Sequence, residues 1–96
     1  MMYVYILTNK NNTTLYVGVT NNLIRRILEH KFDKNNGFSK CYNTHKLVYY
    51  EYTDNADDAI YREKCLKRSY RKIKNKLITR MNPNWDDLSE KILSHN

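Results

Sequence analysis

Two short runs of β-branched and aromatic residues stand at the beginning of this chain, and a polar stretch lies between them. The runs cover residues 2–7 and 14–19, and the polar stretch is Asn9-Lys10-Asn11-Asn12. Such side chains favour strands, and asparagine tolerates the positive φ of a tight turn. The pattern therefore predicts an antiparallel hairpin as the first element of the fold.

Helical periodicity begins directly after this hairpin. Asn21 or Asn22 is expected to cap a helix that runs to about Phe32. Its buried face is expected to carry the four aliphatic residues Leu23, Ile24, Ile27 and Leu28. Residues 33–43, which include Gly37, are expected to form a loop before a third strand over 46–52.

The second half of the chain is predicted to be helical. Asp54 or Asn55 is expected to cap a helix from Ala56 to about Arg68, and a third helix follows through Arg80. Asn82-Pro83 ends the pattern because proline supplies no backbone donor. A closing amphipathic helix is expected to carry the apolar residues Trp85, Leu88, Ile92 and Leu93.

These elements predict an α+β fold in which a small three-stranded antiparallel β-sheet is flanked by helices. The 96 residues suffice for one domain over 1–96, with a core over 1–80 and a C-terminal tail helix over 81–96. The two cysteines, Cys41 and Cys65, lie far apart and match no zinc or disulfide spacing. No apolar run approaches the roughly 20 residues that span a bilayer, so we expect a soluble cytoplasmic protein without membrane contact.

The charge of the chain is concentrated in its second half. The formal net charge is +7, and residues 62–80 contain nine Lys or Arg and one acid, Glu63. Such clustering attracts polyanions; nucleic acid is the commonest partner and an anionic membrane surface is the second. The side chains predicted to bind nucleic acid are Lys64, Lys67, Arg68, Arg71 and Lys72. The alternative is a solvated helix face that only keeps the protein soluble.

The tyrosines of the hairpin are candidates for chemistry. Side chains alternate across a strand, so Tyr5 lies on the opposite side from Val4 and Ile6, and Tyr16 on the opposite side from Val17. If the two phenols share one side of the hairpin, their hydroxyls emerge together. Gly18 would then allow a ligand or another backbone to approach. The alternative is that tyrosine is present only because it forms strands well.

Three ionisable residues downstream add to this set. Arg26 and His30 are neighbours on one face of the first helix, where arginine can bind phosphate oxygens and histidine can transfer a proton. Glu63 falls on the apolar stripe of the second helix, together with Ala56, Ala59, Ile60 and Leu66. A carboxylate there is costly unless it is paired or binds a cation, and one glutamate suffices for Mg²⁺. The alternatives are an idle exposed pair for Arg26 and His30, and a salt bridge to a basic side chain such as Arg26 for Glu63.

Taken in order, these motifs resemble the GIY-YIG nuclease superfamily, and in particular its small stand-alone bacterial members. Tyr3-Val4-Tyr5 and Tyr16-Val17-Gly18 resemble the two naming motifs, although Tyr3 stands where the family has a leading glycine. The segment 16–26 resembles the run from the second motif to the catalytic arginine, which aligns with Arg26. Segments 47–51, 59–64 and 82–88 resemble the third strand, the glutamate helix and the tail, so the likeness covers essentially the whole chain.

The resemblance implies a single-metal phosphodiesterase acting on DNA with little sequence preference. Glu63 would hold one Mg²⁺ or Mn²⁺ ion, and Arg26 would stabilise the charge that develops on the phosphate. Tyr5 or Tyr16 would position or deprotonate water, with His30 as a rival base. Asn75 stands where many members carry an accessory asparagine.

Two other readings remain open from the sequence. One is a non-catalytic nucleic-acid-binding module, and the other is a subunit that docks a partner protein, which would supply target choice. A monomer or a weak homodimer is compatible with all of them. A monomeric nuclease would nick one strand.

Overall fold

The hairpin and a third strand form one antiparallel sheet in the computed structural model, which describes residues 1–32 and 44–94. The strands are β1 (Met2–Thr8), β2 (Leu15–Thr20) and β3 (Lys46–Thr53), in the spatial order β2-β1-β3. Each strand lies within one residue of its predicted bounds. Asn12 has a φ of 58° at the hairpin turn and donates its backbone N–H to Asn9 O at 3.0 Å. The prediction of a three-stranded antiparallel sheet is confirmed.

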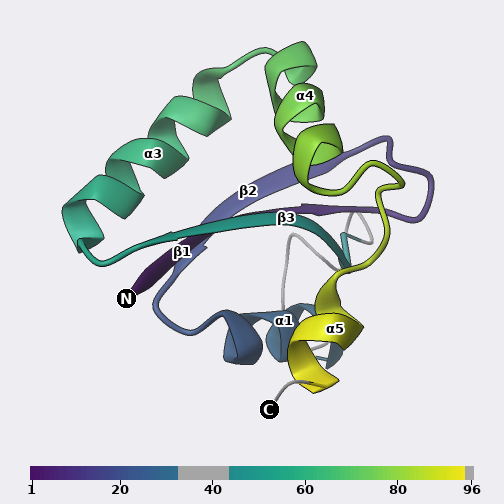
Figure 1. The fold of residues 1–96 in the computed structure, drawn as a ribbon, viewed down its shortest axis with the longest axis horizontal. Helices are drawn as coiled ribbons and strands as arrows, with labels where there is room; N and C mark the ends of the chain where they lie inside the picture. Colours follow the sequence, from purple (N-terminus) through teal and green to yellow (C-terminus); the bar gives the residue numbers. More distant parts are fainter. Residues whose placement is uncertain (33–43, 95–96) are drawn as a thin grey trace.

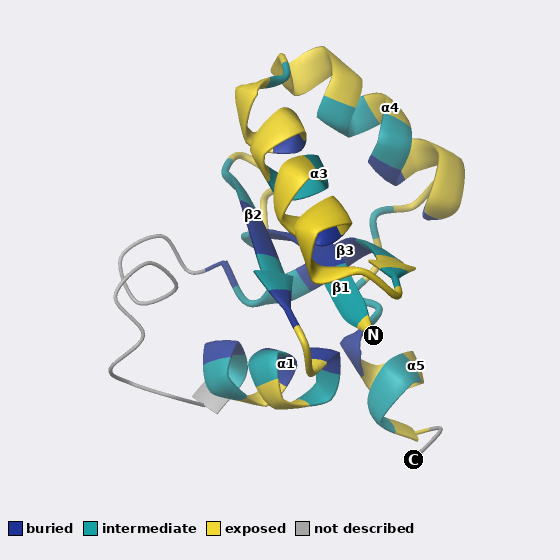
Figure 2. Ribbon diagram, turned by 90° about the vertical axis from the view of Figure 1, so that its left-hand side faces the viewer, coloured by how far each residue is buried: buried dark blue, intermediate teal, exposed yellow. Residues whose placement is uncertain are grey.

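Helices cover both faces of this sheet, as Figure 1 shows. Helices α3 (Ala56–Arg68) and α4 (Arg71–Met81) lie on one face, and α1 (Leu23–Phe32) and α5 (Ser89–Ser94) lie on the other. The side view in Figure 2 separates the two helical layers with the sheet between them. The predicted α+β class is therefore confirmed as a three-layer arrangement.

Polar side chains cap two of these helices, and the Asn82-Pro83 break follows a third. Asn22 Oδ1 accepts the backbone N–H of Arg25 at 3.0 Å, which caps α1. Asn55 Oδ1 accepts the backbone N–H groups of Asp57 and Asp58 and caps α3. Helix α4 ends at Met81, immediately before the predicted Asn82-Pro83 break.

The two faces of the sheet have different chemistry. We call the side under α3 and α4 the aliphatic face; its buried strand residues include Val4, Ile6, Val17 and Val48. We call the side under α1 and α5 the tyrosine face; it carries Tyr3, Tyr5, Tyr16 and Tyr50 beside Leu7 and Leu47. The alternation of side chains along β1 and β2 produces this difference directly.

The buried stripe of α1 differs from the prediction. Leu28 is 41% exposed, whereas His30 is 3% exposed and takes the inner position one turn beyond Leu23 and Ile27. On α3, Ala59 and Leu66 are buried, but Ala56 and Ile60 are exposed. Both buried stripes therefore hold fewer residues than expected.

The tail also differs from the prediction of one amphipathic helix. Among the described residues that follow Met81, only Ser89–Ser94 is helical, and Trp85 lies before it with a φ of 55°. Trp85 packs against the aliphatic core, whereas Leu88, Ile92 and Leu93 pack against the tyrosine face. The chain between α4 and α5 therefore crosses from one side of the sheet to the other. Buried Asn82 supports this crossing by donating to Val48 O and Asp86 O.

Three further sequence predictions concern the loop after α1, the cysteines and membrane spans. The predicted loop over 33–43, with Gly37 and Cys41, is not part of the described structure. Cys65 is a free, exposed thiol. Within the described ranges, every helix is too short or too polar to cross a bilayer.

Candidate active site

The hairpin brings two phenols together on the tyrosine face. Tyr5 pairs with Gly18 in the strand register, and the rings of Tyr5 and Tyr16 have their centroids 6.3 Å apart. A Cβ on Gly18 would lie 2.4 Å from the Tyr5 hydroxyl oxygen. The space above Gly18 is thus filled by the phenol of Tyr5, where the sequence had suggested room for a ligand. Glycine is required here because no larger residue leaves room for that ring.

Histidine joins the two phenols from α1. Nε2 of His30 lies 3.3 Å from the Tyr5 hydroxyl, and the imidazole centroid is 5.6 Å from that of Tyr16. Burial, assisted by the positive charge of Arg26, lowers the pKa of His30 from 6.5 to about 4. His30 is therefore neutral at pH 7, and its ring can take part in a hydrogen bond without carrying charge.

The two phenols differ in their access to solvent. Tyr5 is 1% exposed, and burial raises its pKa well above the usual value of 10, with the neighbouring Tyr16 adding to the effect. Tyr5 therefore stays protonated at neutral pH. Tyr16 is only partly buried, so it is the phenol of the pair that a substrate can reach.

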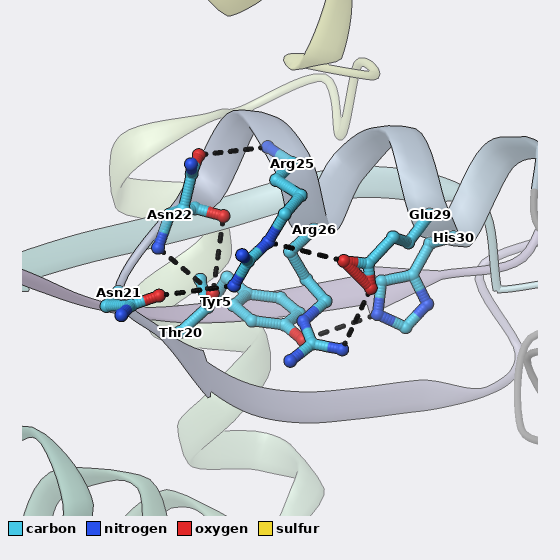
Figure 3. A network of polar contacts seen from close by, with 8 residues as sticks. All are labelled: Tyr5, Thr20, Asn21, Asn22, Arg25, Arg26, Glu29 and His30. Carbon is cyan, nitrogen blue, oxygen red and sulfur yellow. Dashed lines mark hydrogen bonds and ion pairs between the residues drawn. The ribbon is translucent and has the colours of Figure 1, made fainter.

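Arg26 lies beside this cluster, as the close-up in Figure 3 shows. Its Nη1 donates to Oε2 of Glu29 at 3.4 Å, and the same carboxylate lies 3.5 Å from Nε of Arg25. The Nε of Arg26 is buried and has no hydrogen-bond partner among the described residues. An unsatisfied buried donor costs about 1–3 kcal/mol, which an oxygen acceptor from a ligand would recover.

Glu63 stands apart from this cluster. It lies on α3, which covers the aliphatic face, whereas Tyr5, Tyr16 and His30 meet on the tyrosine face. Figure 2 shows α3 and α1 on opposite sides of the sheet. Its side chain is 15% exposed and forms an ion pair with Lys67 at 3.4 Å, rather than with Arg26. The edge strand β2, which α3 contacts, lies between the two positions.

The remaining predicted residues lie on α3 and α4. Asn75 Oδ1 accepts from Nε of Arg71 at 3.2 Å, and both residues belong to α4 on the far side of the sheet from His30. Lys64, Arg68 and Lys72 are exposed. The structure thus brings together Tyr5, Tyr16, Gly18, Arg26 and His30, and leaves Glu63, Asn75 and the basic residues on the opposite layer.

The donor set for a metal is small. Among residues 1–32 and 44–94, no three His, Cys, Asp or Glu side chains are grouped as metal ligands. Glu63 offers a single half-buried carboxylate with one cationic neighbour. This set fits Mg²⁺ that takes its other ligands from water and from phosphate, and it does not fit a preformed all-protein cage.

Glu29 is the member of the site that sequence reasoning missed. It forms ion pairs with Arg25 and Arg26, and its charge acts on both Tyr5 and His30. The sequence did contain a sign of these ion pairs. Glu29 follows Arg25 by four residues and Arg26 by three, and residues at these spacings meet on one helix face.

Comparison with known proteins gives a consistent set of similarities. Residues 1–77 match the GIY-YIG catalytic domain. The UPF0213 protein CPE1444 of Clostridium perfringens is 42% identical over 83 residues, covering 82% of this chain and 84% of that protein. A UPF0213 protein of Pediococcus pentosaceus is 36% identical over 76 residues, covering 79% of each. The solution structure of the UPF0213 protein BH0048 of Bacillus halodurans superposes with a TM-score of 0.57 at 25% identity, covering 94% of this chain and 96% of that one.

Proposed function

The chain belongs to the GIY-YIG catalytic domain family, and we propose that it is a metal-dependent endonuclease that hydrolyses phosphodiester bonds in DNA with little sequence preference. Membership of a nuclease family supports a nucleic-acid substrate. The choice of DNA, the weak sequence preference and the catalytic roles below are parts of the proposal.

One observation carries the proposal: two phenols and a neutral imidazole meet beside an arginine whose buried Nε finds no partner in the part of the chain that the structure describes. A phosphate oxygen is the acceptor that best fits this donor because a guanidinium binds phosphate through charge-assisted hydrogen bonds. The same contact would offset the negative charge that grows on the phosphate during hydrolysis. Arg26 is therefore assigned to the scissile phosphate.

The phenols and His30 are assigned different tasks. Tyr16 is the group that faces the substrate and orients the attacking water. Tyr5 remains protonated because of its raised pKa, so it acts as a hydrogen-bond link between Tyr16 and His30. His30 is unprotonated at pH 7 and is the group in this chain of contacts that can accept a proton. This assignment makes Tyr16 and His30 the candidates for the base and excludes ionised Tyr5.

Glu63 is the residue that would hold Mg²⁺ or Mn²⁺. The bound ion would supply Lewis-acid polarisation of the phosphate and assist the leaving oxygen. Arg26 and Glu63 approach β2 from opposite layers, so a substrate that uses both must lie along this edge strand. Gly18 is the residue of β2 that leaves room for the Tyr5 ring beside that path.

Binding is assigned to the exposed cations of α3 and α4, which include Lys64, Lys67, Arg68, Arg71 and Lys72. Contacts to phosphates give affinity but carry no sequence information, so binding is expected to be salt-sensitive and unselective. We also propose that the protein acts in the cytoplasm as a monomer or weak homodimer, and that a partner protein supplies any targeting. A monomer with one site would nick.

A second candidate is a non-catalytic nucleic-acid-binding module. One observation favours it: Glu63 is paired with Lys67 on the layer opposite the phenols and Arg26. In that case the basic helices bind nucleic acid, and the phenol cluster only contributes to the packed core.

The test is cleavage of labelled single-stranded, duplex, flap and branched DNAs with Mg²⁺ or Mn²⁺. Wild type is compared with Glu63→Gln, with Arg26→Lys and with Glu90→Gln, a matched control on the exposed side of α5. We expect metal-dependent cutting that the first two changes reduce at least 100-fold, since single electrostatic contacts to a transition state contribute about that much. Cutting by Glu63→Gln at the wild-type rate would remove Glu63 from the mechanism, and salt-sensitive binding without cutting by any variant would favour the binding module.

A further inference from the structure

The outer face of α4 forms an open groove in which every charged side chain is basic. Its volume is about 910 Å³, and its lining residues are Arg71, Lys72, Asn75, Lys76, Thr79 and Arg80. Arg71 and Lys72 of this set were named from the sequence as nucleic-acid contacts, within a basic run expected to contact phosphates. The groove is therefore better defined than the basic run in the sequence, because it gathers cations with an amide and a hydroxyl on one side of a helix.

The cations of the groove are spaced at a regular interval. Lys72, Lys76 and Arg80 follow one another every four residues and so project from neighbouring turns. Their side chains are exposed, and none of the ion pairs found within residues 1–32 and 44–94 involves them. Their charges are thus not neutralised by acids of the described structure.

Arg71 connects one end of the groove to the hairpin turn. Its Nη1 donates to Thr13 O at 2.8 Å and its Nη2 to Asn12 O at 2.5 Å. The chain runs from this turn into β2 and reaches Tyr16 three residues after Thr13. The Arg71 end of the groove therefore lies at the end of the sheet that holds Tyr16. The groove is on the aliphatic side, whereas Tyr16 is on the tyrosine face.

We propose that the α4 groove is a phosphate-backbone site that guides nucleic acid around the hairpin turn toward Tyr16. This inference deepens the proposed function and rests on it for the position of the cut. The nine residue-to-residue steps from Arg71 to Arg80 span about 14 Å, and the three steps from Thr13 to Tyr16 add about 10 Å. At 3.4 Å per base pair, this path corresponds to roughly seven base pairs.

The chemistry of the groove favours nucleic acid over an anionic membrane. Its lining has no large apolar side chain, whereas a helix that lies in a membrane interface buries an apolar face among the lipids. Asn75 and Thr79 add neutral hydrogen-bonding groups of the kind that contact phosphate and sugar oxygens. A row of cations with such groups between them suits a repeating line of phosphates.

The experiment measures binding of fluorescent duplexes of 4–24 base pairs in EDTA, so that cleavage plays no part. The groove variant Lys76→Gln/Arg80→Gln is compared with Lys64→Gln/Arg68→Gln, which removes one Lys and one Arg at the same spacing on α3. We expect the groove variant to weaken binding at least tenfold and to lower the slope of log affinity against log salt by about 2. The α3 variant should change both less. Wild-type affinity should rise with length up to roughly seven base pairs and more gently beyond.

Two results would overturn the inference. Equal losses in the two variants would indicate a general effect of net charge. Loss of binding to vesicles of anionic lipid by the groove variant, with unchanged binding to duplexes, would assign the groove to a membrane instead. Because these measurements need no cleavage, their failure is distinguishable from failure of the proposed nuclease activity, which the metal-dependent assay tests separately.

Discussion

The two faces of the sheet are built from the same three strands but serve different purposes. On the aliphatic face, branched side chains pack against Ala59, Leu66 and Ile78 of α3 and α4, and the hydroxyl of Tyr49 donates to Glu51. On the tyrosine face, phenols and His30 are buried against α1, and each polar group needs a partner. Both faces contribute buried apolar side chains to stability, but the tyrosine face also carries the polar cluster assigned to catalysis, which packing alone would not favour.

The largest expected effect on stability comes from the aliphatic face. Ile6 is fully buried there, so Ile6→Ala should lower the free energy of unfolding by about 2–5 kcal/mol through lost burial and a residual cavity. Urea denaturation monitored by circular dichroism measures this loss. The activity of the remaining folded molecules should be unchanged.

Leu7→Ala is the matched change on the tyrosine face. Leu7 is 2% exposed and pairs with Tyr16 in the register, so its truncation should reduce stability to a similar degree and also reduce cleavage by the folded fraction. If both variants affected cleavage equally after correction for folding, the proposed division of labour between the faces would be wrong.

Acid should destabilise the tyrosine face through His30. Its pKa is about 4 in the folded protein and 6.5 in the unfolded chain, so the unfolded chain binds more protons between these values. The stability that neutral His30 contributes is therefore fully present above about pH 6.5 and is lost as the pH falls toward 4. The shift corresponds to about 3 kcal/mol. We expect the free energy of unfolding, measured in urea from pH 7 to pH 4, to show this fall.

His30→Gln provides the control for this pH dependence. Glutamine keeps hydrogen-bonding capacity but does not titrate, so the variant should lose most of the slope between pH 6.5 and 4. An unchanged slope would mean that other groups, and not the buried imidazole, set the acid sensitivity.

The smallest of these effects is expected at Gly18. A methyl group there would meet the Tyr5 hydroxyl oxygen and its ring carbon Cζ at 2.4 and 2.5 Å, so Gly18→Ala should destabilise the fold by about 1–3 kcal/mol through overpacking. Thermal unfolding of Gly18→Ala, Tyr5→Leu and the double variant forms a double-mutant cycle. Leucine removes the clashing ring, so the two changes should couple by about 1 kcal/mol or more, and strict additivity would contradict the contact.

Local sequence patterns predicted most of the elements correctly. The strands, the caps at Asn22 and Asn55, and the end of α4 before Asn82-Pro83 all depend on neighbouring residues, and neighbouring residues are visible in a sequence. Tyr5 and Tyr16 lie on one face of the sheet because side chains alternate along each strand, which is also a local property. These features agree with prediction because backbone geometry and short-range hydrogen bonds determine them.

The prediction was less successful for helix faces and for the tail. His30 replaced Leu28 as the buried residue, and Trp85 packed on a different side of the sheet from Leu88. Both outcomes depend on the angle at which a helix or connection crosses the sheet. Packing between distant segments sets that angle, and a periodic pattern alone leaves several angles possible.

By itself, the sequence determined the strands, most of the helices and the set of residues able to perform phosphate chemistry. Only the tertiary structure decided that Tyr5, Tyr16, Arg26 and His30 meet on one face while Glu63 lies on the other layer, and that Lys72, Lys76 and Arg80 line one groove that ends at the hairpin turn. The physical reason is that residue type and local geometry are properties of short segments. The side of the sheet that each helix covers is instead a property of the whole chain, set by which apolar surfaces it must bury.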